Sequence, residues 1–539
     1  MNAFRRDFLK LAGTGLAGAA TSAVITPGAR AGVTAAPIPA AGTSSVYDVR
    51  TYGATGDGKT IDSPAINKTI EAAAAAGGGT VRFPAGTYAS YSIRLKSNIA
   101  LYIEQGATIL AASTSLDGTT GGYDPAEPNQ PWEAYQDYGH NHWHNSLIWG
   151  ESINNFAILG PGLIWGKGLS RGLSDKDRPR ADQPGAGNKA IALKNCHNAI
   201  LRDFSILEGG HFGILATGVD NLTIDNLKID TNRDGMDIDC CRNVRVSNCS
   251  VNSPWDDGIC PKSSFALGYA RATENVTITN CYVTGDYQLG TLLDGTFKRF
   301  GPDFKVVPTG RIKCGTESNG GFKNITISNC VFESCRGFAL ETVDGALLED
   351  VTFVGITMRD IRNSPLFLRL GTRMRGPQGV PVGTLKRILI SNVTSYGAVT
   401  ELPSIISGVP GHFIEDIKIN DVYFHQLGGG TKQMADLQPE EKENTYPEPR
   451  MFGTLPAHGF LIRHVKNIEF GNVEIASEKP DVRPAFWLKD VDGADFFRIK
   501  TTKGQSAPAF SLNDVKDFRV FGSRAIKDIS EDMIEHKEF

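Results

Sequence analysis

A sequence repeat of about ten residues recurs through the middle and the second half of this chain and limits the folds that it can adopt. Each copy has a short alternating run rich in β-branched residues, then Asn or Gly, then a second short run, which is typical of two strands that meet at a bend. The copies begin at Asp220, Arg242, Glu274 and Lys323, with weaker copies at Glu349, Lys386, Glu415 and Lys466. The tightest copies lie about 22 residues apart, and insertions stretch others to roughly 50.

A repeat of this length predicts a coil of strands, in which residues one period apart stack on neighbouring turns about 4.8 Å apart. Asn tolerates the left-handed backbone conformation and can bond its own backbone, which gives a repeated Asn at the bend a mechanical reason. A doubly wound α/β fold would require amphipathic helices between the strands, and the sequence does not show them. We therefore predict an all-β chain, a parallel β-helix or solenoid, whose inserted loops form the binding surface on one face.

The segment before the repeats has a different pattern. Residues 63–76 have helix character, with Ser63 as a possible N-cap and Pro64 at the first position, and three consecutive glycines end the segment. Two short strands, 80–83 and 87–90, are expected after it. We predict that this helix caps the open hydrophobic end of the coil.

The N-terminus resembles a twin-arginine export signal. Arg5 and Arg6 precede Phe-Leu-Lys and a weakly hydrophobic run rich in Ala and Gly, which predicts a removable signal over residues 1–31. The alternative is a chance arginine pair in a disordered tail. We expect an exported protein, periplasmic or secreted, with a flexible linker over 32–45 and a single β-helix domain over 46–539.

Charge and hydropathy exclude some classes of partner. The formal charge is −4, and removal of residues 1–31, with four basic and one acidic side chains, would leave about −7. Because a nucleic-acid partner would need a basic patch, we expect none. No run beyond the signal approaches the roughly 18 apolar residues of a membrane span, so we expect no membrane span.

Cysteine placement indicates core packing. Cys249, Cys281 and Cys330 each follow the bend Asn of a repeat, and Cys196 follows Asn195 in an earlier candidate turn. We predict that these cysteines point inward as a ladder of small apolar groups. The odd total of nine and an adjacent Cys-Cys pair argue against a full disulfide framework, and no CxxC spacing indicates zinc.

Two acidic motifs lie one repeat apart. The first is Asn232-Arg233-Asp234-Gly235, and the second is Trp255-Asp256-Asp257-Gly258 followed by Lys262-Ser263. On stacked turns, Asp234, Asp256 and Asp257 would share one patch of surface. Crowded carboxylates raise at least one pKa, and this provides a proton donor near neutral pH. The alternative is turn chemistry alone, since Asp is common at bends.

The capping segment, the Asn bends and the paired acidic motifs together resemble glycoside hydrolase family 28, the polygalacturonase and rhamnogalacturonase family of pectin lyase-like, right-handed parallel β-helices. The family's Asn-Thr-Asp-Gly is matched with Arg in place of Thr, and its Gly-Asp-Asp with Lys-Ser is matched at Asp256, Asp257 and Lys262. The resemblance runs from about Val46 to Gly371. It implies a glycosidase of the polygalacturonase type acting on galacturonan or rhamnogalacturonan polysaccharides or oligosaccharides.

Two further family motifs are missing. Where the family has Gly-His-Gly, this chain has Gly310-Arg311-Ile312-Lys313, and where the family has Arg-Ile-Lys, it has Ala339-Leu340-Glu341. The family's basic residues hold a galacturonate carboxylate, so their replacement bears on polygalacturonan specificity. Arg311 and Lys313 could bind a carboxylate from the neighbouring turn.

The resemblance implies an inverting mechanism, with Asp256 as general acid and with Asp234 and Asp257 positioning the water. The remaining candidate substrate-binding residues are Asn232, Lys262, His211, Arg311, Lys313, Glu317 and Glu341. His211 could equally be an ordinary turn residue, and Glu317 and Glu341 could replace the missing family residues or be solvated. We expect no metal and no cofactor, a polysaccharide or oligosaccharide substrate, and a monomer.

Two other activities and the roles of two loops stay open. A calcium-dependent polysaccharide lyase would use the three aspartates as ligands, and a non-catalytic glycan-binding β-helix would use the same fold. His140, His142 and His144 alternate, so on a strand they would share one face and could form a metal site or an aromatic sugar-binding loop. The polar segment 428–452 is expected to be a long inserted loop that could fold over the cleft.

Overall fold

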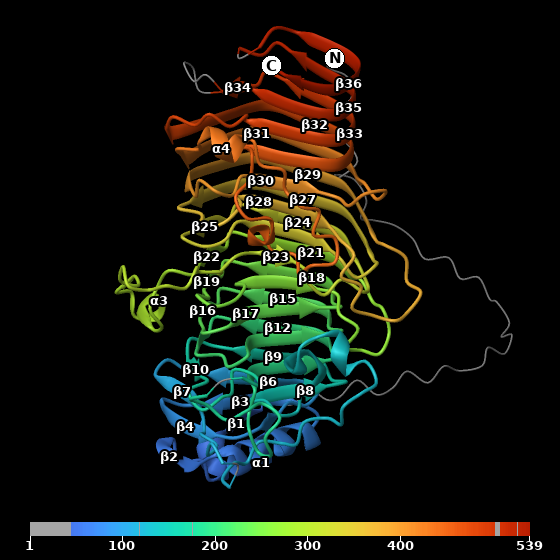
Figure 1. Cartoon of the computed structure of the whole chain (residues 1–539). Helices are drawn as coiled ribbons and strands as arrows, with labels where there is room; N and C mark the ends of the chain where they lie inside the picture. Colours follow the sequence, from blue (N-terminus) through green and yellow to red (C-terminus); the bar gives the residue numbers. More distant parts are fainter. Residues whose placement is uncertain (1–44, 118, 175, 502–506, 525) are drawn as a thin grey trace, which may run out of the picture. The chain divides into compact units, whose positions relative to one another are not determined.

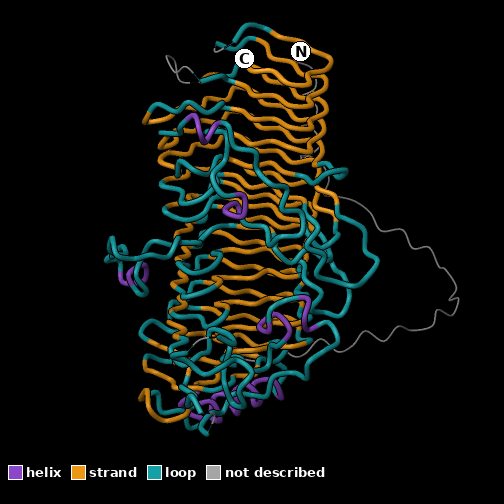
Figure 2. The backbone as a smooth tube through the Cα atoms, in the orientation of Figure 1, coloured by secondary structure: helices purple, strands orange, loops and turns teal. Residues whose placement is uncertain are grey.

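The structure is a computed structural model that describes residues 45–117, 119–174, 176–501, 507–524 and 526–539. The predicted export signal and residues 32–44 of the predicted linker lie outside the described residues. Ser45–Phe539 forms one compact unit, which winds as the predicted right-handed parallel β-helix (Figures 1 and 2). None of the helices within the described ranges is long and apolar enough to cross a membrane.

One sheet of six strands carries the candidate site along the edge where its strands begin. Its order is β20-β17-β14-β11-β8-β5, so each turn of the coil adds a strand beside the previous one. The strands are β5 (Ile93–Arg94), β8 (Ile148–Glu151), β11 (Lys189–Lys194), β14 (Phe212–Thr217), β17 (Asp234–Asp239) and β20 (Ile259–Lys262).

The other strands form a network of thirty strands that closes the coil. In the first half these are β1 (Val46–Asp48), β2 (Asp57–Ile61), β3 (Gly79–Phe83), β4 (Gly86–Ser90), β6 (Ile99–Ile103), β7 (Ala107–Ala111), β9 (Asn154–Leu159), β10 (Leu163–Trp165), β12 (His197–Arg202), β13 (Ser205–Leu207), β15 (Asp220–Asp225), β16 (Lys228–Asp230), β18 (Arg242–Ser247) and β19 (Ser250–Asn252). In the second half they are β21 (Thr273–Thr279), β22 (Tyr282–Thr284), β23 (Lys313–Cys314), β24 (Phe322–Ser328), β25 (Val331–Glu333), β26 (Phe338–Thr342), β27 (Leu347–Arg359), β28 (Leu366–Leu370), β29 (Thr384–Ala398), β30 (Ser404–Ser407), β31 (Ile414–Gly428), β32 (Phe460–Lys479), β33 (Phe486–Phe497), β34 (Lys500–Thr501), β35 (Phe510–Phe521) and β36 (Ile529–Glu538).

The ends of the coil are closed differently. Helix α1 (Ser63–Ala75) packs buried Ile66, Ile70 and Ala73 at the N-terminal end, where a capping helix was predicted. Its N-cap is Asp62 and not Ser63, and the Asp62 carboxylate accepts hydrogen bonds from backbone amides of the preceding loop. At the other end, β36 pairs antiparallel with β35, whereas neighbouring turns pair in parallel.

The remaining helices lie in inserted loops. They are α2 (Tyr138–Asn141), α3 (Thr291–Asp294) and α4 (Lys432–Ala435), with 3-10 turns η1 (Val49–Tyr52), η2 (Glu133–Tyr135) and η3 (Pro449–Phe452). Figure 1 shows α3 on a loop that projects from the coil. The loops thus add material at selected turns without interrupting the strand stacking.

The bend asparagines have the predicted left-handed backbone. Asn226, Asn248, Asn280 and Asn329 all have φ between 54° and 57°. The amides of Asn226, Asn248 and Asn280 also bond the turn before, for example from Asn248 Nδ2 to Asp225 Oδ1 at 2.8 Å. Each bend is therefore stabilised both by its own conformation and by its neighbour on the adjacent turn.

The cysteines lie in the core, as predicted. All nine are free and buried, and Cys196, Cys249, Cys281 and Cys330 belong to the continuous hydrophobic cluster inside the coil. The thiols of Cys249, Cys281 and Cys330 bond backbone carbonyls two residues earlier. They act as small apolar packing groups and not as disulfide partners.

Candidate active site

Neighbouring turns bring three carboxylates together. Asp234 begins β17, and Asp256 and Asp257 lie in the loop just before β20, the next strand of the same sheet. The backbone amide of Gly235 donates to the Asp257 carbonyl at 2.9 Å, which fixes the register between the two turns. One carboxylate oxygen from each aspartate lies within 4.8 Å of the others. We call these three residues the carboxylate cluster.

Asp257 is held by two buried cations. Arg311 Nε donates to Asp257 Oδ1 at 2.8 Å, and Lys313 Nζ pairs with Oδ2. Burial opposes ionisation of Asp257, but the charges of Lys313 and Arg311 outweigh it and hold the pKa well below the ordinary range. The carboxylate that Arg311 and Lys313 bind from the neighbouring turn is therefore the protein's own Asp257.

Asp234 has the opposite electrostatic environment. It is almost fully buried, and burial together with the nearby charge of Asp256 raises its pKa well above the ordinary value. Asp256 pairs with Arg233 at 3.0 Å, and its side chain is 28% exposed. One patch thus contains a carboxyl that favours its protonated form, a carboxylate that stays ionised, and a third group that reaches solvent.

A second row of buried charges supports the cluster. Lys262 Nζ lies 3.0 Å from Glu317 Oε2 and 3.8 Å from Asp237 Oδ2. Burial disfavours the ammonium, but the carboxylates Asp237 and Glu317 together raise the Lys262 pKa. Lys262 and Glu317 thereby neutralise each other in the wall of the site.

Glu341 is enclosed on the next turn. It is fully buried, accepts a hydrogen bond from Thr316 Oγ1 at 3.0 Å and lies 3.8 Å from Arg311. Burial raises the Glu341 pKa. Solvation, the simpler alternative for Glu317 and Glu341, does not describe either side chain, because both are buried.

His211 and Asn232 lie beside the cluster. His211 immediately precedes Phe212, the strand partner of Asp234, and stacks on the Phe212 ring with centroids 4.3 Å apart. Burial and the charge of Arg233 lower the pKa of His211 to about 3, so its imidazole is neutral. Asn232 is buried, and its Oδ1 has no hydrogen-bond partner among the described residues.

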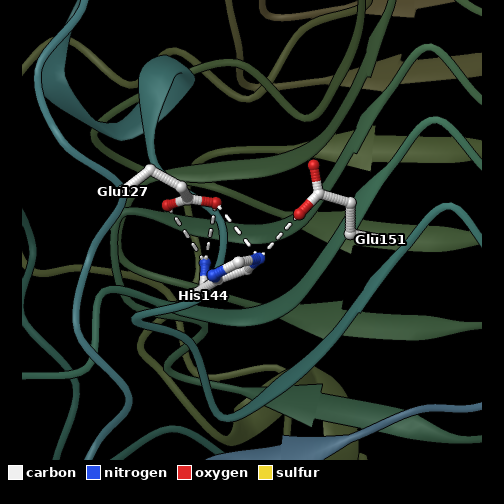
Figure 3. A group of neighbouring side chains, drawn as sticks. All are labelled: Glu127, His144 and Glu151. Atoms are coloured by element: carbon white, nitrogen blue, oxygen red, sulfur yellow. Dashed lines mark hydrogen bonds and ion pairs between the residues drawn. The ribbon is translucent and has the colours of Figure 1, made fainter.

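The three alternating histidines do not share one face. His140 lies in α2 and contacts Asp237 at 3.2 Å, whereas His142 bonds the Tyr138 carbonyl at 2.8 Å. His144 instead lies between Glu127 and Glu151 (Figure 3). The prediction of a shared face assumed a strand, and a helical turn sends the rings to different partners.

Among the residues that the structure describes, two groups of side chains could supply metal ligands. Glu127, His144 and Glu151 form one, and the carboxylate cluster forms the other. In the first, Lys194 lies 3.1 Å from Glu151, and His144 Nε2 lies 2.8 Å from the same carboxylate. Both groups therefore already contain cationic or hydrogen-bonding partners for their carboxylates.

The predicted long loop, 428–452, lies against the site. Tyr446 Oη is 3.0 Å from Thr316 Oγ1, and Glu448 lies 2.8 Å from Arg336 and 3.6 Å from Arg311. Buried Arg463 fixes the loop by donating to its backbone carbonyls at Pro439 and Glu440. Tyr446 and Glu448 were not predicted as site residues. The composition of the segment predicted an inserted loop but no contact of any particular side chain.

Family profiles cover the candidate site. A profile described as rhamnogalacturonase A/epimerase, pectate lyase-like, matches residues 46–260. Another, described as a right-handed β-helix region, matches residues 186–366. The two together include every residue of the carboxylate cluster and both cations that bind Asp257.

Two individual relatives and one solved structure have names of the polygalacturonase type. A probable polygalacturonase of Vitis vinifera is 22% identical over 437 residues, covering 76% of this chain and 80% of the relative. An exo-poly-alpha-D-galacturonosidase of Dickeya chrysanthemi is 25% identical over 268 residues, 42% of each chain. In the solved exopolygalacturonase of Thermotoga maritima, the fold is similar with a TM-score of 0.59 at 18% identity, covering 80% of this chain and 91% of that one.

Proposed function

This chain is a divergent member of the glycoside hydrolase family 28-like β-helix proteins, and from that premise we propose that it hydrolyses glycosidic bonds in pectin-type polysaccharides or oligosaccharides. The observation that carries the proposal is the carboxylate cluster, in which Asp234 and Asp257 have pKa values shifted in opposite directions. Glycoside hydrolysis needs an enzyme group that donates a proton and an ionised carboxylate of the enzyme, both next to the bond that is cleaved. The names of the relatives supply the class of polysaccharide.

The roles follow from burial and charge. In this proposal, Asp256 protonates the leaving oxygen because it is the member of the cluster that reaches solvent. Burial and the charge of Asp256 raise the pKa of the neighbouring Asp234, which favours the protonated form of that carboxyl. Asp257 remains ionised and orients the attacking water through lone pairs that its two cations leave free.

Water is proposed as the nucleophile, with inversion at the anomeric carbon. The nearest oxygens of the cluster lie within 4.8 Å, closer than the roughly 6.5–9.5 Å between carboxyl groups in most inverting enzymes. A retaining mechanism, however, needs a free carboxylate as nucleophile. Both oxygens of Asp257 bind cations, Asp256 pairs with Arg233, and burial favours protonated Asp234.

A cationic cavity beside the cluster supports an acidic polysaccharide substrate. Lys305, Arg362 and Arg450 line a cavity of about 410 Å³, and none of them forms an ion pair with another described residue. Phe304 of the same cavity packs edge-on against Trp255, the neighbour of Asp256, with centroids 6.2 Å apart. Unpaired cations at this place suit the carboxylates of a uronate chain.

The charge pattern disfavours a calcium-dependent lyase. Arg233 pairs with Asp256, and Arg311 and Lys313 pair with Asp257. A calcium ion would have to compete with these three cations for the same oxygens. The cations in turn are held by carboxylates and are not free to act as a lyase base.

The test is to incubate the protein and its Asp256→Asn variant with pectic polymers and oligosaccharides, following reducing ends and ultraviolet absorbance together. We expect reducing ends without absorbance, reduced at least about a hundredfold in the variant because the proton donor is lost. Retained glycan binding by the variant would show that the substitution removes chemistry and not folding.

The controls separate the alternatives. Ultraviolet absorbance that a chelator abolishes would identify a lyase and overturn the proposal. Glycan binding without new reducing ends would identify a binding protein. Asp492→Asn, at an exposed position of β33 outside the carboxylate cluster and both cavities, serves as a matched aspartate control that should keep most of the activity.

A further inference from the structure

A cavity of about 730 Å³ lies on the N-terminal side of the carboxylate cluster. Its walls come from two inserted loops, residues 124–145 before β8 and residues 173–186 before β11. These strands lie in the same sheet as β17, two and three places away from it. At about 4.8 Å per strand, the cavity is roughly 10–15 Å from Asp234, within reach of one substrate chain.

The cavity connects to the cluster through its inner wall. Tyr138 and Leu173 line the cavity, and each directly follows a residue that lies against Arg233. Asp137 Oδ2 is 3.8 Å from Arg233, and a methyl group added at Gly172 would lie 3.4 Å from the same guanidinium. Arg233 in turn pairs with Asp256, so the cavity and the proposed proton donor adjoin.

Two buried amide side chains in the wall have an unsatisfied oxygen. Gln136 and Asn145 are only 5% and 2% exposed, and neither Gln136 Oε1 nor Asn145 Oδ1 has a hydrogen-bond partner among the described residues. Their orientation is fixed, because the Asn145 amide nitrogen donates to the Ala181 carbonyl and that of Gln136 to the Trp132 carbonyl. Buried polar atoms without partners are rare and indicate a ligand or water that satisfies them.

The charged groups of the wall are acceptors too. Asp124 and Asp182 already pair with Arg94 and Arg180, whereas Glu133 Oε1 has no hydrogen bond among the described residues and lies 3.5 Å from His142 Nδ1. None of the described lining residues is lysine or arginine. The wall therefore offers oxygens that accept hydrogen bonds and no cation that would bind a carboxylate.

We propose that this cavity is a subsite for an uncharged sugar residue of the substrate. The hydroxyl groups of a neutral sugar donate to the oxygens of Gln136, Asn145 and Glu133, and its apolar face packs on Tyr138 and the prolines of the wall. A uronate has hydroxyl groups too, but its carboxylate would add a further acceptor and a negative charge beside the acceptors of the wall. The inference rests on the proposed function and adds that the substrate carries a neutral sugar on this side of the cleaved bond.

The test measures binding without turnover, in the Asp256→Asn background. Methyl glycosides of galactose, rhamnose and arabinose, and galacturonate, are titrated calorimetrically. We expect at least one neutral glycoside to bind, and we expect any binding of galacturonate to come from the cationic cavity and not from this one. Leu173→Lys, at an exposed position of the wall, should weaken the binding of that neutral glycoside about tenfold. Leu389→Lys, on the exposed face of β29, should leave its affinity unchanged.

Three results of the titration would contradict the proposed subsite. Galacturonate binding that Leu173→Lys weakens as much as neutral binding, no neutral binding at all, or neutral binding unaffected by Leu173→Lys would each overturn the subsite. Because binding does not depend on hydrolysis, a failure of the proposed activity would leave a positive result in place. A wild-type protein that hydrolyses pectic chains but fails this titration would instead retain its function and lose this subsite.

Discussion

At the scale of single residues, the site is an arrangement of opposed charges. Arg311 and Lys313 stand where the resemblance called for a histidine motif, and both bind Asp257. These two residues therefore have a different role from the family's motif, because a buried cation bonded to a carboxylate is not available to a substrate. Burial raises the pKa of Asp234, which has no ion-pair partner among the described residues.

A pH prediction follows for Arg233. Burial raises the Asp234 pKa, and the Arg233 charge partly opposes that rise. Arg233→Gln should therefore raise the pKa further, keep the acid form to higher pH and move the basic limb of the kcat/KM profile up by about one unit. Arg245→Gln on β18 is the matched control and should leave the profile in place. A limb that stays or moves to lower pH would show that the Asp234–Asp256 pair does not supply the proton.

At the scale of strands and turns, the bend asparagines stabilise the stacking. Asn248 has φ 57°, bonds Asp225 on the turn before and accepts a bond from Asn280 on the turn after. The alternating runs predicted these bends, because both the strand period and the left-handed bend are local properties of the sequence. Later repeats form one continuous strand, as in β29 and β31, and some have another bend residue, such as Asp421 in β31.

Substitution of Asn248 tests this element. Asn248→Val should cost about 2 kcal/mol in the free energy of unfolding, because a β-branched residue is strained at positive φ. Asn248→Gly should cost about 1 kcal/mol less, since it loses the ladder bonds but not the conformation. Urea unfolding monitored by circular dichroism gives both values. Equal losses for the two variants would mean that the bend conformation contributes nothing.

At the scale of the whole molecule, the coil brings distant loops to one edge. The repeat spacing predicted that Asp234, Asp256 and Asp257 would meet, since parallel turns stack at a fixed period. The loops that build the two cavities and carry Tyr446 have no such period, so their contacts depend on tertiary packing that the sequence pattern does not encode. The histidines of residues 140–144 show the same limit, because a shared face depended on an extended chain and the segment instead begins with a helical turn.

Proton NMR of the first product released from a pectic oligosaccharide tests directly whether the anomeric carbon is inverted. If a water held by Asp257 attacks while Asp256 donates its proton, the new reducing end will first appear as the anomer opposite to the cleaved linkage, before mutarotation. A product that first appears with the original anomeric configuration would require a covalent intermediate on one of the aspartates. Signals of an unsaturated uronate would contradict hydrolysis altogether.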